Sequence, residues 1–352
     1  MAALGFTHPT PPCAATLHRV LRRLDQAQVE AALGGWAEEV LATSRRPQRG
    51  RERDSGGGSG TAGAGAGQRE QEQERERERE QEREGVSVDG KCLRGSRKQG
   101  APGTHRLSAV SQRLGLTLAQ EAVDDKTNEI TAVQAVLRRL VLEGRVITVD
   151  ALLTQRAVAQ TSADGGGAYV MVAKDNQPRL RRDIGGLLAT PAHVPGGVPP
   201  RQAQTEERGH GRLERRTLTA RALLPGDGDW PDARQVFRSE RRRIHLRTGE
   251  VSTEVIEGVT TLAADAAAPS DLLRFLRAHW PIENGSHWVR DVTFDEDRSQ
   301  VRCGAIPGVM AAVRSAAIGL LRVSGASTIA AACRRNAAQP WHALALFGIV
   351  RE

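Results

Sequence analysis

Apolar residues recur at helical spacing near the beginning of the chain. Between residues 14 and 41 they fall three or four positions apart, which places them along one face of each of two helices. Asp25 lies three positions before Gln28, and this spacing predicts a capping box that begins the second helix. Two helices of this length form a hairpin that is too small to be stable alone. The apolar positions are Leu17, Val20, Leu21, Leu24, Val29, Leu33, Trp36 and Val40.

The composition changes between residues 44 and 84. Gly, Ser and Ala come first, and the alternating run "REQEQEREREREQERE" follows. Such a segment cannot bury enough apolar area to offset the entropy lost on ordering it. We therefore predict a disordered, low-complexity linker, and we expect proteolysis to cut there first and release a stable fragment that begins near Val86.

The pattern after the linker favours strands. Runs over 86–88, 106–110 and 116–123 lie close enough together for an antiparallel meander. A helical pattern over 130–140 follows, and then "RVITVD" (145–150), a near-continuous apolar run of the kind that is buried on both faces of a sheet.

A helix near residues 154–163 and the strand-like segment "AYVMVAKDNQ" continue the alternation. Three antiparallel strands followed by alternating strands and helices indicate an α/β fold with a mixed sheet.

Residues 185–265 interrupt this alternation with Pro and Gly clusters, Arg-rich segments and short β-prone runs, so we interpret them as a β-rich insertion. Helical patterns return at 270–279 and 307–323. The chain is therefore expected to have four regions. These are a helical N-terminal region (1–43), the linker (44–84), the main α/β domain with its insertion (85–325) and a C-terminal tail (326–352).

Composition limits the class of protein. A chain of 352 residues with 39% hydrophobic and 3% aromatic content can bury a core, which must be largely aliphatic. We judge no apolar run long enough to span a bilayer and find no signal-peptide pattern, so a soluble, intracellular protein without a membrane partner is expected. The four cysteines lie far apart without a CxxC pair, which predicts free thiols.

The charge balance points to a polyanionic partner. The formal net charge is +8, although the segment Arg69–Glu84 alone holds eight Glu and five Arg, so the rest of the chain is more basic still. Basic proteins bind nucleic acids by neutralising phosphates and releasing counterions. Nucleic acid is therefore the leading partner class.

Two acids follow predicted strands. Asp89 comes directly after the run 86–88, and Asp150 ends "RVITVD". Sites commonly form at the carboxyl ends of strands in open α/β sheets. Simpler explanations stay open, because Asp89-Gly90 is also a hairpin signal and Asp150 could be the N-cap of the next helix. A third carboxylate, Glu283, lies in a segment that is dense in His, Trp and acids.

Six segments and the apolar helix that closes them resemble the DDE insertion-sequence transposases of the H-repeat-associated type. They follow that family's order with similar gaps, and together they cover roughly Val86 to Val323. Each motif alone is weak, whereas the ordered set is specific. The segments are "VDGKCLRGS", "KTNEI", "VITVDALLTQ", "VAKDNQ", "ERGHGRLERR" and "RAHWPIENGSHWVRDVTFDEDRS".

The resemblance implies a ribonuclease H-like mixed-sheet core in which Asp89, Asp150 and Glu283 form an acidic triad. Three carboxylates of this kind can hold two Mg²⁺ or Mn²⁺ ions for in-line phosphoryl displacement. Other motif positions would contact DNA phosphates or bases, with solvated surface as the simpler alternative for each. These positions are Lys91, Arg94, Lys126, Asn128, Lys174, Asn176, Gln177, His210 and Arg212.

The chemical role of some neighbouring residues is open. His210 could form a turn in a basic loop or touch phosphate, and His279 and His287 could pack the helix of Glu283 or act chemically. For Trp280 and Trp288, packing against that helix is the favoured interpretation.

The implied activity is transposition of a bacterial insertion sequence, with strand cleavage at the element ends and transfer of the 3′-hydroxyl into target DNA. The alternatives are a metal-dependent nuclease with the same triad and an inactive remnant that only binds DNA. The expected partners are the element ends and target DNA, bound by a dimer or larger assembly during synapsis. The expected location is the cytoplasm, in association with the nucleoid.

Overall fold

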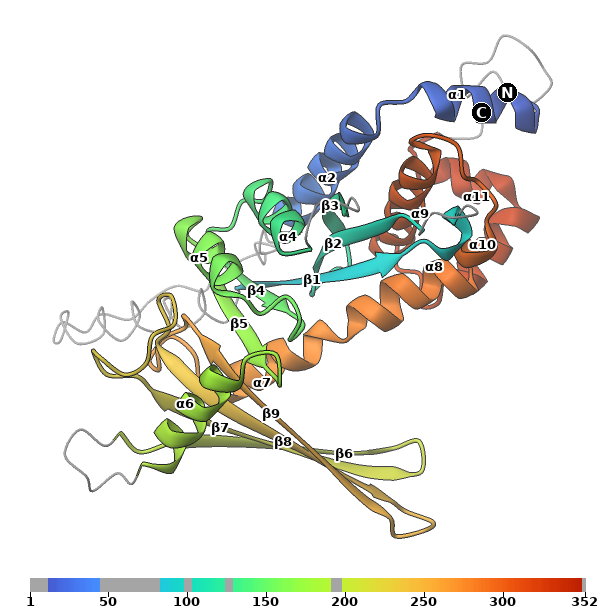
Figure 1. Cartoon of the computed structure of the whole chain (residues 1–352). Coiled ribbons are helices and arrows are strands. Elements are labelled where there is room, and N and C mark those ends of the chain that lie inside the picture. The colour runs from blue at the N-terminus through green and yellow to red at the C-terminus, as the bar shows by residue number, and fades with distance from the viewer. Residues whose placement is uncertain (1–11, 45–82, 98–102, 124–128, 191–197, 350–352) are drawn as a thin grey trace, which may run out of the picture. The chain divides into compact units, whose positions relative to one another are not determined.

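The computed structural model describes residues 12–44, 83–97, 103–123, 129–190 and 198–349 (Figure 1). Contacts divide the chain into two units. Unit 1 comprises Met1–Val40, Val86–Leu140 and His279–Glu352, and unit 2 comprises Leu41–Gly85 and Val141–Ala278. The predicted linker lies almost entirely outside the described residues.

Unit 1 is built around an antiparallel meander, as predicted. Its strands are β1 (Glu84–Cys92), β2 (His105–Ser111) and β3 (Thr117–Val123), and β2 pairs with both neighbours. The apolar alternation of these strands places Val86, Val88 and Leu107 in the core with no exposed area. The helix α4 (Glu129–Arg138) follows and buries Val133 and Leu137.

The N-terminal helices are α1 (Ala14–Arg23) and α2 (Gln26–Thr43). The backbone N–H of Gln28 donates to Asp25 Oδ1 at 2.9 Å, so the predicted cap at the start of α2 is present. Glu30 of α2 forms a buried ion pair with Arg106 of β2. At Gly34 an added Cβ would lie 2.5 Å from the backbone oxygen of Leu118, so only glycine permits this close approach to β3. The second helix is therefore part of the core of unit 1.

The closing helices of unit 1 are α9 (Ile306–Val323), α10 (Ile329–Ala338) and α11 (Pro340–Ala345). The predicted tail is thus helical, and Ile329 and Ala332 pack with Ile318 and Leu321 in a small core cluster. We expected no apolar run long enough to span a bilayer, and this expectation was wrong. The helix α9 has 18 residues with a mean hydropathy of 1.5, so its length and composition would allow it to cross a membrane. Half of that helix is buried, as in the core helix of a globular domain.

Unit 2 begins with the predicted strand-helix alternation. It consists of β4 (Arg145–Val149), α5 (Arg156–Asp164), β5 (Ala168–Ala173) and α6 (Pro178–Ala189), and β4 and β5 are parallel. Both strands are almost continuously apolar and buried. Such a pattern is typical of strands that are covered on both faces.

The β-rich insertion is present and extends the sheet of unit 2. Its strands are β6 (Arg201–Gly209), β7 (Arg212–Ala222), β8 (Gln235–His245) and β9 (Val251–Thr260). Within this unit the strand order is β4-β5-β9-β8-β7-β6, with β9 antiparallel to β5. The predicted start of the insertion at residue 185 falls inside α6.

The helix α7 (Pro269–His279) closes unit 2. Its Leu272 and Phe275 pack against Leu218 and Phe237 of the insertion in one core cluster. The predicted fold class is confirmed: the chain is a mixed α/β protein with a ribonuclease H-like order of elements, a β-rich insertion and a small helical N-terminal region.

Candidate active site

Asp89 lies inside a strand. It pairs with Ser108 across the β1–β2 ladder, and Gly90 pairs with Leu107. The hairpin-turn alternative is therefore wrong, and so is the expectation that Asp89 ends the strand, because β1 continues to Cys92. The backbone N–H of Gly90 donates to Asp89 Oδ1 at 2.8 Å. This bond orients the carboxylate.

His287 is next to Asp89. Its Nδ1 lies 3.6 Å from Asp89 Oδ2, and its side chain is 12% exposed. Burial, and then the charges of Arg290 and Lys91, lower the pKa of His287 to about 3. The imidazole is therefore neutral near pH 7. Its Nε2 is buried and has no hydrogen-bond partner in the part of the chain that the structure describes.

Lys91 has a carboxylate partner. Its Nζ lies 2.7 Å from both carboxylate oxygens of Asp291 in α8 (Trp288–Val292), and the lysine side chain is 7% exposed. Asp297 is 3.8 Å away. Lys91 therefore ties β1 to α8, and a DNA phosphate would have to compete with Asp291 for it. The expected phosphate contact stays a prediction.

Two 3₁₀ turns pack beside the end of β1. They are η2 (Arg94–Ser96) and η4 (Glu296–Arg298). A Cβ at Gly95 would lie 2.2 Å from the backbone oxygen of Ser299, which explains the glycine in "LRGS". Arg94 and Arg298 are 71% and 85% exposed, and they pair with Asp297 at 3.7 Å and with Asp295 at 3.3 Å.

Glu283 lies in an irregular helix. The segment η3 (Ile282–His287) is a π-helix between α7 and α8, and Glu283 is on its exposed side while Ile282 and Ser286 are buried. Since His287 of the same segment is next to Asp89, this helix passes beside the strand that carries Asp89.

Arg322 of α9 was missed by the sequence analysis. Its guanidinium donates to the backbone oxygens of Gly285 and Gly115, the latter at 2.8 Å. A Cβ at Gly285 would lie 2.7 Å from Arg322 Nη2. Burial lowers the pKa of Arg322. The only sequence signal was an arginine at the end of an apolar helix.

A second buried charge cluster supports α8. Arg290 has no exposed side-chain area and lies 2.8 Å from Glu296, which also pairs with Arg314 of α9 at 3.1 Å. Removing one partner of such a cluster leaves an uncompensated buried charge, which costs several kcal/mol. The helix α8 is thus held both by the pair of Asp291 with Lys91 and by the pair of Arg290 with Glu296.

The tryptophans of this segment are partly exposed. Trp280 and Trp288 are 50% and 57% exposed, so about half of each side chain is covered. The interpretation of both residues as packing for the Glu283 helix stays a prediction.

Asp150 lies in unit 2, directly after β4. Its Oδ1 accepts the backbone N–H of Leu153 at 2.9 Å, and its backbone oxygen accepts the hydroxyl of Thr154 at 3.0 Å. The carboxylate therefore caps a turn. The helix α5 begins later, with Gln155 at its N-cap position.

The loop after β5 contacts the loop after β4. Asn176 Nδ2 donates to the backbone oxygen of Ala151 at 2.6 Å, and Gln177 Nε2 donates to that of Thr154 at 3.1 Å. Both amides therefore support the turn of Asp150, whereas Lys174 is exposed. The expected contacts of Lys174, Asn176 and Gln177 with DNA stay predictions.

The triad spans both units, since Asp89 and Glu283 belong to unit 1 and Asp150 to unit 2. Their convergence stays a prediction. Within the described ranges no three His, Cys, Asp or Glu side chains gather as a metal site. Lys126 and Asn128 lie outside the described residues. All four cysteines are free thiols, as predicted.

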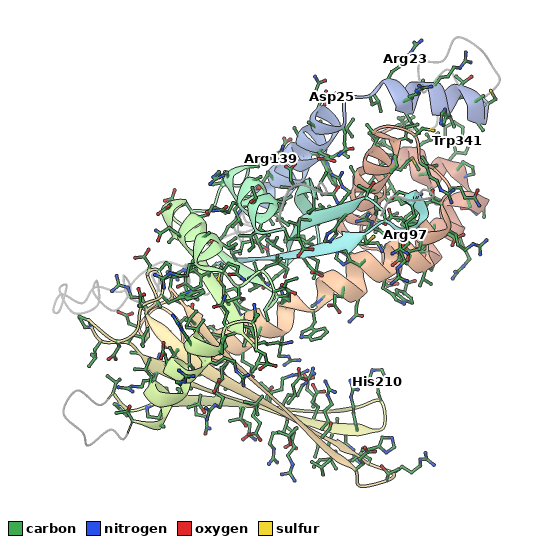
Figure 2. All side chains as sticks on the ribbon, in the orientation of Figure 1. Arg23, Asp25, Arg97, Arg139, His210 and Trp341 are labelled. Carbon is green, nitrogen blue, oxygen red and sulfur yellow. The ribbon has the colours of Figure 1, made fainter. Side chains whose placement is uncertain are left out.

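The insertion presents its arginines on long strands. His210 is at the tip of the β6–β7 hairpin (Figure 2), where His210 and Gly211 have φ of 49° and 73°, so the turn interpretation of His210 is confirmed. Arg212 lies 3.9 Å from Glu214. Most other arginines of these strands pair with glutamates on a neighbouring strand or, for Arg216 and Glu214, on the same strand. These pairs are Arg215–Glu206, Arg216–Glu207, Arg216–Glu214, Arg238–Glu257, Arg241–Glu254 and Arg243–Glu214.

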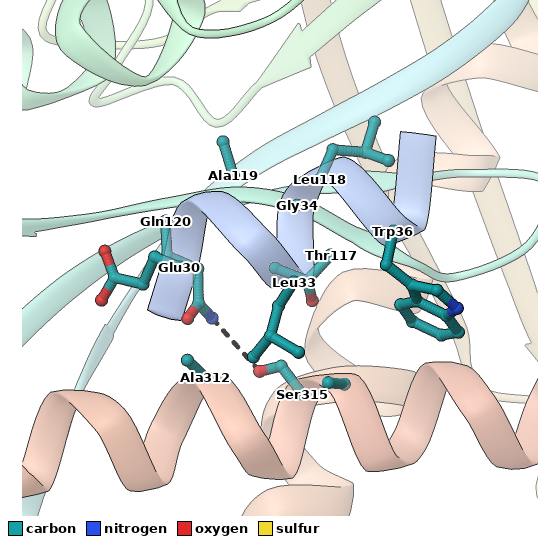
Figure 3. A pocket seen from close by; sticks show the side chains of 11 residues that line it. Glu30, Leu33, Gly34, Trp36, Thr117, Leu118, Ala119, Gln120, Ala312 and Ser315 are labelled. Carbon is teal, nitrogen blue, oxygen red and sulfur yellow. Dashed lines mark hydrogen bonds between the residues drawn. The ribbon is translucent and has the colours of Figure 1, made fainter. Parts of the chain in front are cut away.

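One pocket in unit 1 is too small for a ligand. It measures ≈ 20 Å³ and lies between α2, β3 and α9, where Gln120 Nε2 donates to Ser315 Oγ at 3.1 Å (Figure 3). A water molecule needs roughly 10–15 Å³ by such a measure. The pocket is therefore a packing feature.

Comparisons with known proteins agree with this geometry. The family model "Transposase DDE domain" matches residues 80–307, a range that includes all three triad residues. "Putative transposase YncI" of Escherichia coli O157:H7 is 30% identical over 67% of this chain and 61% of its own length. "H repeat-associated putative transposase YhhI" of E. coli strain K12 is 28% identical over 67% of this chain and 63% of its own.

The chain thus spans about three fifths of the length of these curated relatives. Among solved structures, a piggyBac transposase synaptic complex with hairpin DNA aligns with 71% of this chain and 51% of its own at 10% identity and a TM-score of 0.41, too distant a likeness to carry weight. The family match covers well over half of the chain, so this protein belongs to the transposase DDE domain family.

Proposed function

We propose that this chain is an insertion-sequence transposase that cleaves DNA at the element ends in a metal-dependent reaction and transfers the 3′-hydroxyl into target DNA. The observation that carries the proposal is the family match over residues 80–307, which spans Asp89, Asp150 and Glu283 in the order of the acidic triad. The net charge of +8 fits a DNA substrate.

The donor chemistry of the triad fits a divalent cation. All three residues offer only carboxylate oxygens, the ligands that Mg²⁺ and Mn²⁺ prefer. When bound, two such ions would activate the attacking hydroxyl and stabilise the leaving oxygen.

The chain's own residues position this chemistry. The hydrogen bond from Gly90 orients the Asp89 carboxylate. His287 lies next to the other carboxylate oxygen and is neutral, so it does not compete with a metal ion as a positive charge. The turn that presents Asp150 is held by the amides of Asn176 and Gln177. Lys174, exposed in the same loop, is available to hold a phosphate as a point charge.

The test uses the full chain with duplex DNA that carries the element's own ends, in Mg²⁺ or Mn²⁺. Joined products are expected from a transposase, cleavage without joining from a nuclease, and binding without cleavage from an inactive remnant. Asp150→Asn should abolish cleavage. The matched control is Asp183→Asn on the exposed side of α6, which should leave cleavage unchanged. Failure of the parent chain to cleave in either metal would contradict the proposal.

Synapsis of two element ends would bring at least two copies of the chain together, so we further propose a dimer or larger assembly in the DNA complex. Cross-linking with and without DNA ends would reveal it. The proposed site of action is the nucleoid in the cytoplasm, which fluorescent tagging of the chain would test.

A further inference from the structure

The helix that carries Glu283 contains a rare form of backbone. Residues Ile282–His287 form a π-helix, and well under 1% of residues in globular proteins do so. Its i→i+5 hydrogen bonds give more residues per turn than an α-helix has. Such segments are frequent at functional sites. Both the contact that produces this π-helix and its effect on neighbouring side chains therefore bear on function.

The cause is Arg322. Its guanidinium donates to the backbone oxygen of Gly285, in the middle of the π-helix, and to that of Gly115 in the turn before β3. A side chain inserted at a carbonyl diverts it from the regular helical ladder. Gly285 makes this possible because any Cβ there would lie 2.7 Å from Arg322 Nη2. The π-helix is therefore fixed by packing within unit 1.

The consequence concerns which side chains share a face. Trp280 and Trp288 are eight positions apart, and in an α-helix this spacing overshoots two full turns by about 80°. The wider π turn reduces that offset, so positions 280, 284 and 288 lie nearer to one face of the helix than they would in a regular α-helix. Both indoles are at least half exposed, which is more than is usual for tryptophan in a core. Glu283, in the same helical segment, is also exposed.

We propose that Trp280 and Trp288 form a stacking platform for unpaired bases of the DNA strand that passes Glu283. The proposal rests on the proposed function, which puts Glu283 next to the phosphate that reacts. Indole faces stack on any base, and the gain is sequence-tolerant. Asn284, exposed between the two indoles, can hydrogen-bond a base edge.

Two exposed arginines lie near one end of the platform. Arg94 and Arg298 are 71% and 85% exposed and lie on two 3₁₀ turns that contact each other, and η4 also contacts α8. Arg94 pairs with Asp297 at 3.7 Å and Arg298 with Asp295 at 3.3 Å, so a DNA phosphate at this end of the platform would compete with these carboxylates.

The test measures DNA binding by the full chain without metal, so that cleavage does not enter. The probes are a blunt duplex and the same duplex with a short single-stranded overhang that contains 2-aminopurine. Trp280→Ala and Trp288→Ala should each weaken overhang binding on the order of tenfold and reduce the quenching of the fluorescent base. Binding of the blunt duplex and the salt dependence should not change, because no charge is removed.

Two controls sharpen the result. Trp288→Phe should retain most of the affinity for the overhang, and Trp341→Ala, which removes a tryptophan that is 44% exposed on α11, should have no effect. Equal loss on both probes, or no loss on either, would overturn the platform. A change in oligomeric state with unaltered DNA binding would do the same, because it would assign the indoles to a subunit interface.

The failure of the platform can be told apart from failure of the proposed function. Glu283→Gln is assayed for cleavage in Mg²⁺ alongside the binding series. If the parent cleaves, Glu283→Gln does not, and the tryptophan variants bind the overhang normally, the proposed function is supported and the stacking platform is contradicted. If the parent never cleaves but the tryptophan variants lose the overhang selectively, the platform stands without the reaction.

Discussion

At the scale of single residues, the carboxylate of Asp89 is separable from the fold around it. Ladder hydrogen bonds to β2 fix the backbone on both sides, so Asp89→Asn should fold normally. It removes the negative charge that attracts a divalent cation, and cleavage of element-end DNA should fall by several orders of magnitude. DNA binding, measured by fluorescence anisotropy, should survive. Equal cleavage by the variant and its parent would reduce Asp89 to a structural role.

His287 predicts a dependence of stability on pH. Its pKa is lowered from 6.5 to about 3 in the folded chain, so the unfolded chain takes up a proton first as the pH falls. Stability is therefore complete above about pH 6.5 and decreases below it, with a slope approaching roughly 1.4 kcal/mol per pH unit. Chemical denaturation between pH 7 and 5 should show this decrease.

The slope should be flatter in His287→Gln, which cannot titrate. His210→Asn removes an exposed histidine from a hairpin turn that asparagine tolerates, and it should keep the parent's slope. Identical slopes for all three proteins would mean that His287 does not govern this pH range.

Residue roles were predictable where a local pattern carries them. The position of Asp150 directly after an apolar strand could be predicted because a strand end is a local pattern, whereas the catalytic roles of Asp150 and Glu283 stay predictions. The partner of Lys91 could not be predicted, because Asp291 lies 200 positions away and the pair depends on tertiary packing. The half-exposed state of Trp280 and Trp288 could not be predicted either, because it depends on which neighbouring elements cover the helix.

At the scale of elements, the π-helix should respond to a single methyl group. Gly285→Ala would force Arg322 away from the backbone oxygen that it binds, leaving a buried guanidinium short of a partner. We expect a loss of about 1–3 kcal/mol in the free energy of unfolding. The preference of the chain for DNA with a single-stranded overhang over the blunt duplex should also decrease, although both tryptophans remain.

Gly186→Ala in α6 is the matched control. No atom lies within 4 Å of the added Cβ, so the intrinsic preference of alanine for helices should raise stability by about 0.5–1 kcal/mol. If Gly285→Ala behaved in the same way, the arginine would not determine the form of this helix.

Most regular elements were foreseeable because their patterns are periodic. The meander, the buried strands β4 and β5, and the helices α4, α7 and α9 all lie where the apolar spacing indicates. The π-helix was not foreseeable, since its cause is an arginine 37 positions later in the chain. The helix α6 was missed because its Gly pair weakens the helical pattern.

At the scale of the whole molecule, the structure changes the expected outcome of cutting the chain before β1. The sequence alone favours a stable fragment that begins near Val86. However, α2 supplies Glu30 to the buried Arg106 and packs Gly34 against β3. After cleavage at a protease site introduced between α2 and β1, the N-terminal fragment should stay bound and co-elute with the remainder in size-exclusion chromatography.

Glu30→Gln tests the link. It leaves Arg106 buried without its counter-charge, which should cost about 3–5 kcal/mol and release the fragment. Glu39→Gln, on the same helix, is the control and should retain it. Immediate separation of the unsubstituted fragments would show that α2 contributes little to unit 1.

The overall class followed from the order of elements along the chain, which local patterns give. The division into units did not, because unit 1 joins three distant segments. Sequence periodicity predicts which face of each helix or strand is apolar, but it does not predict which apolar faces pack against one another. The family motifs gave the triad its order in the chain, and its convergence is a prediction that joins residues of both units.

The glutamate–arginine pairs on the outer parts of β6 to β9 have a consequence for self-association. Among the strands that the structure describes, β6 pairs only with β7, so one row of its backbone groups is open to another polypeptide. Exposed edges of this kind nucleate aggregation unless charges interrupt them. Here Glu206, Glu207 and Arg208 follow one another along that edge and are all exposed. A second molecule that added a strand would have to desolvate these charges, which opposes the growth of an extended sheet from this edge.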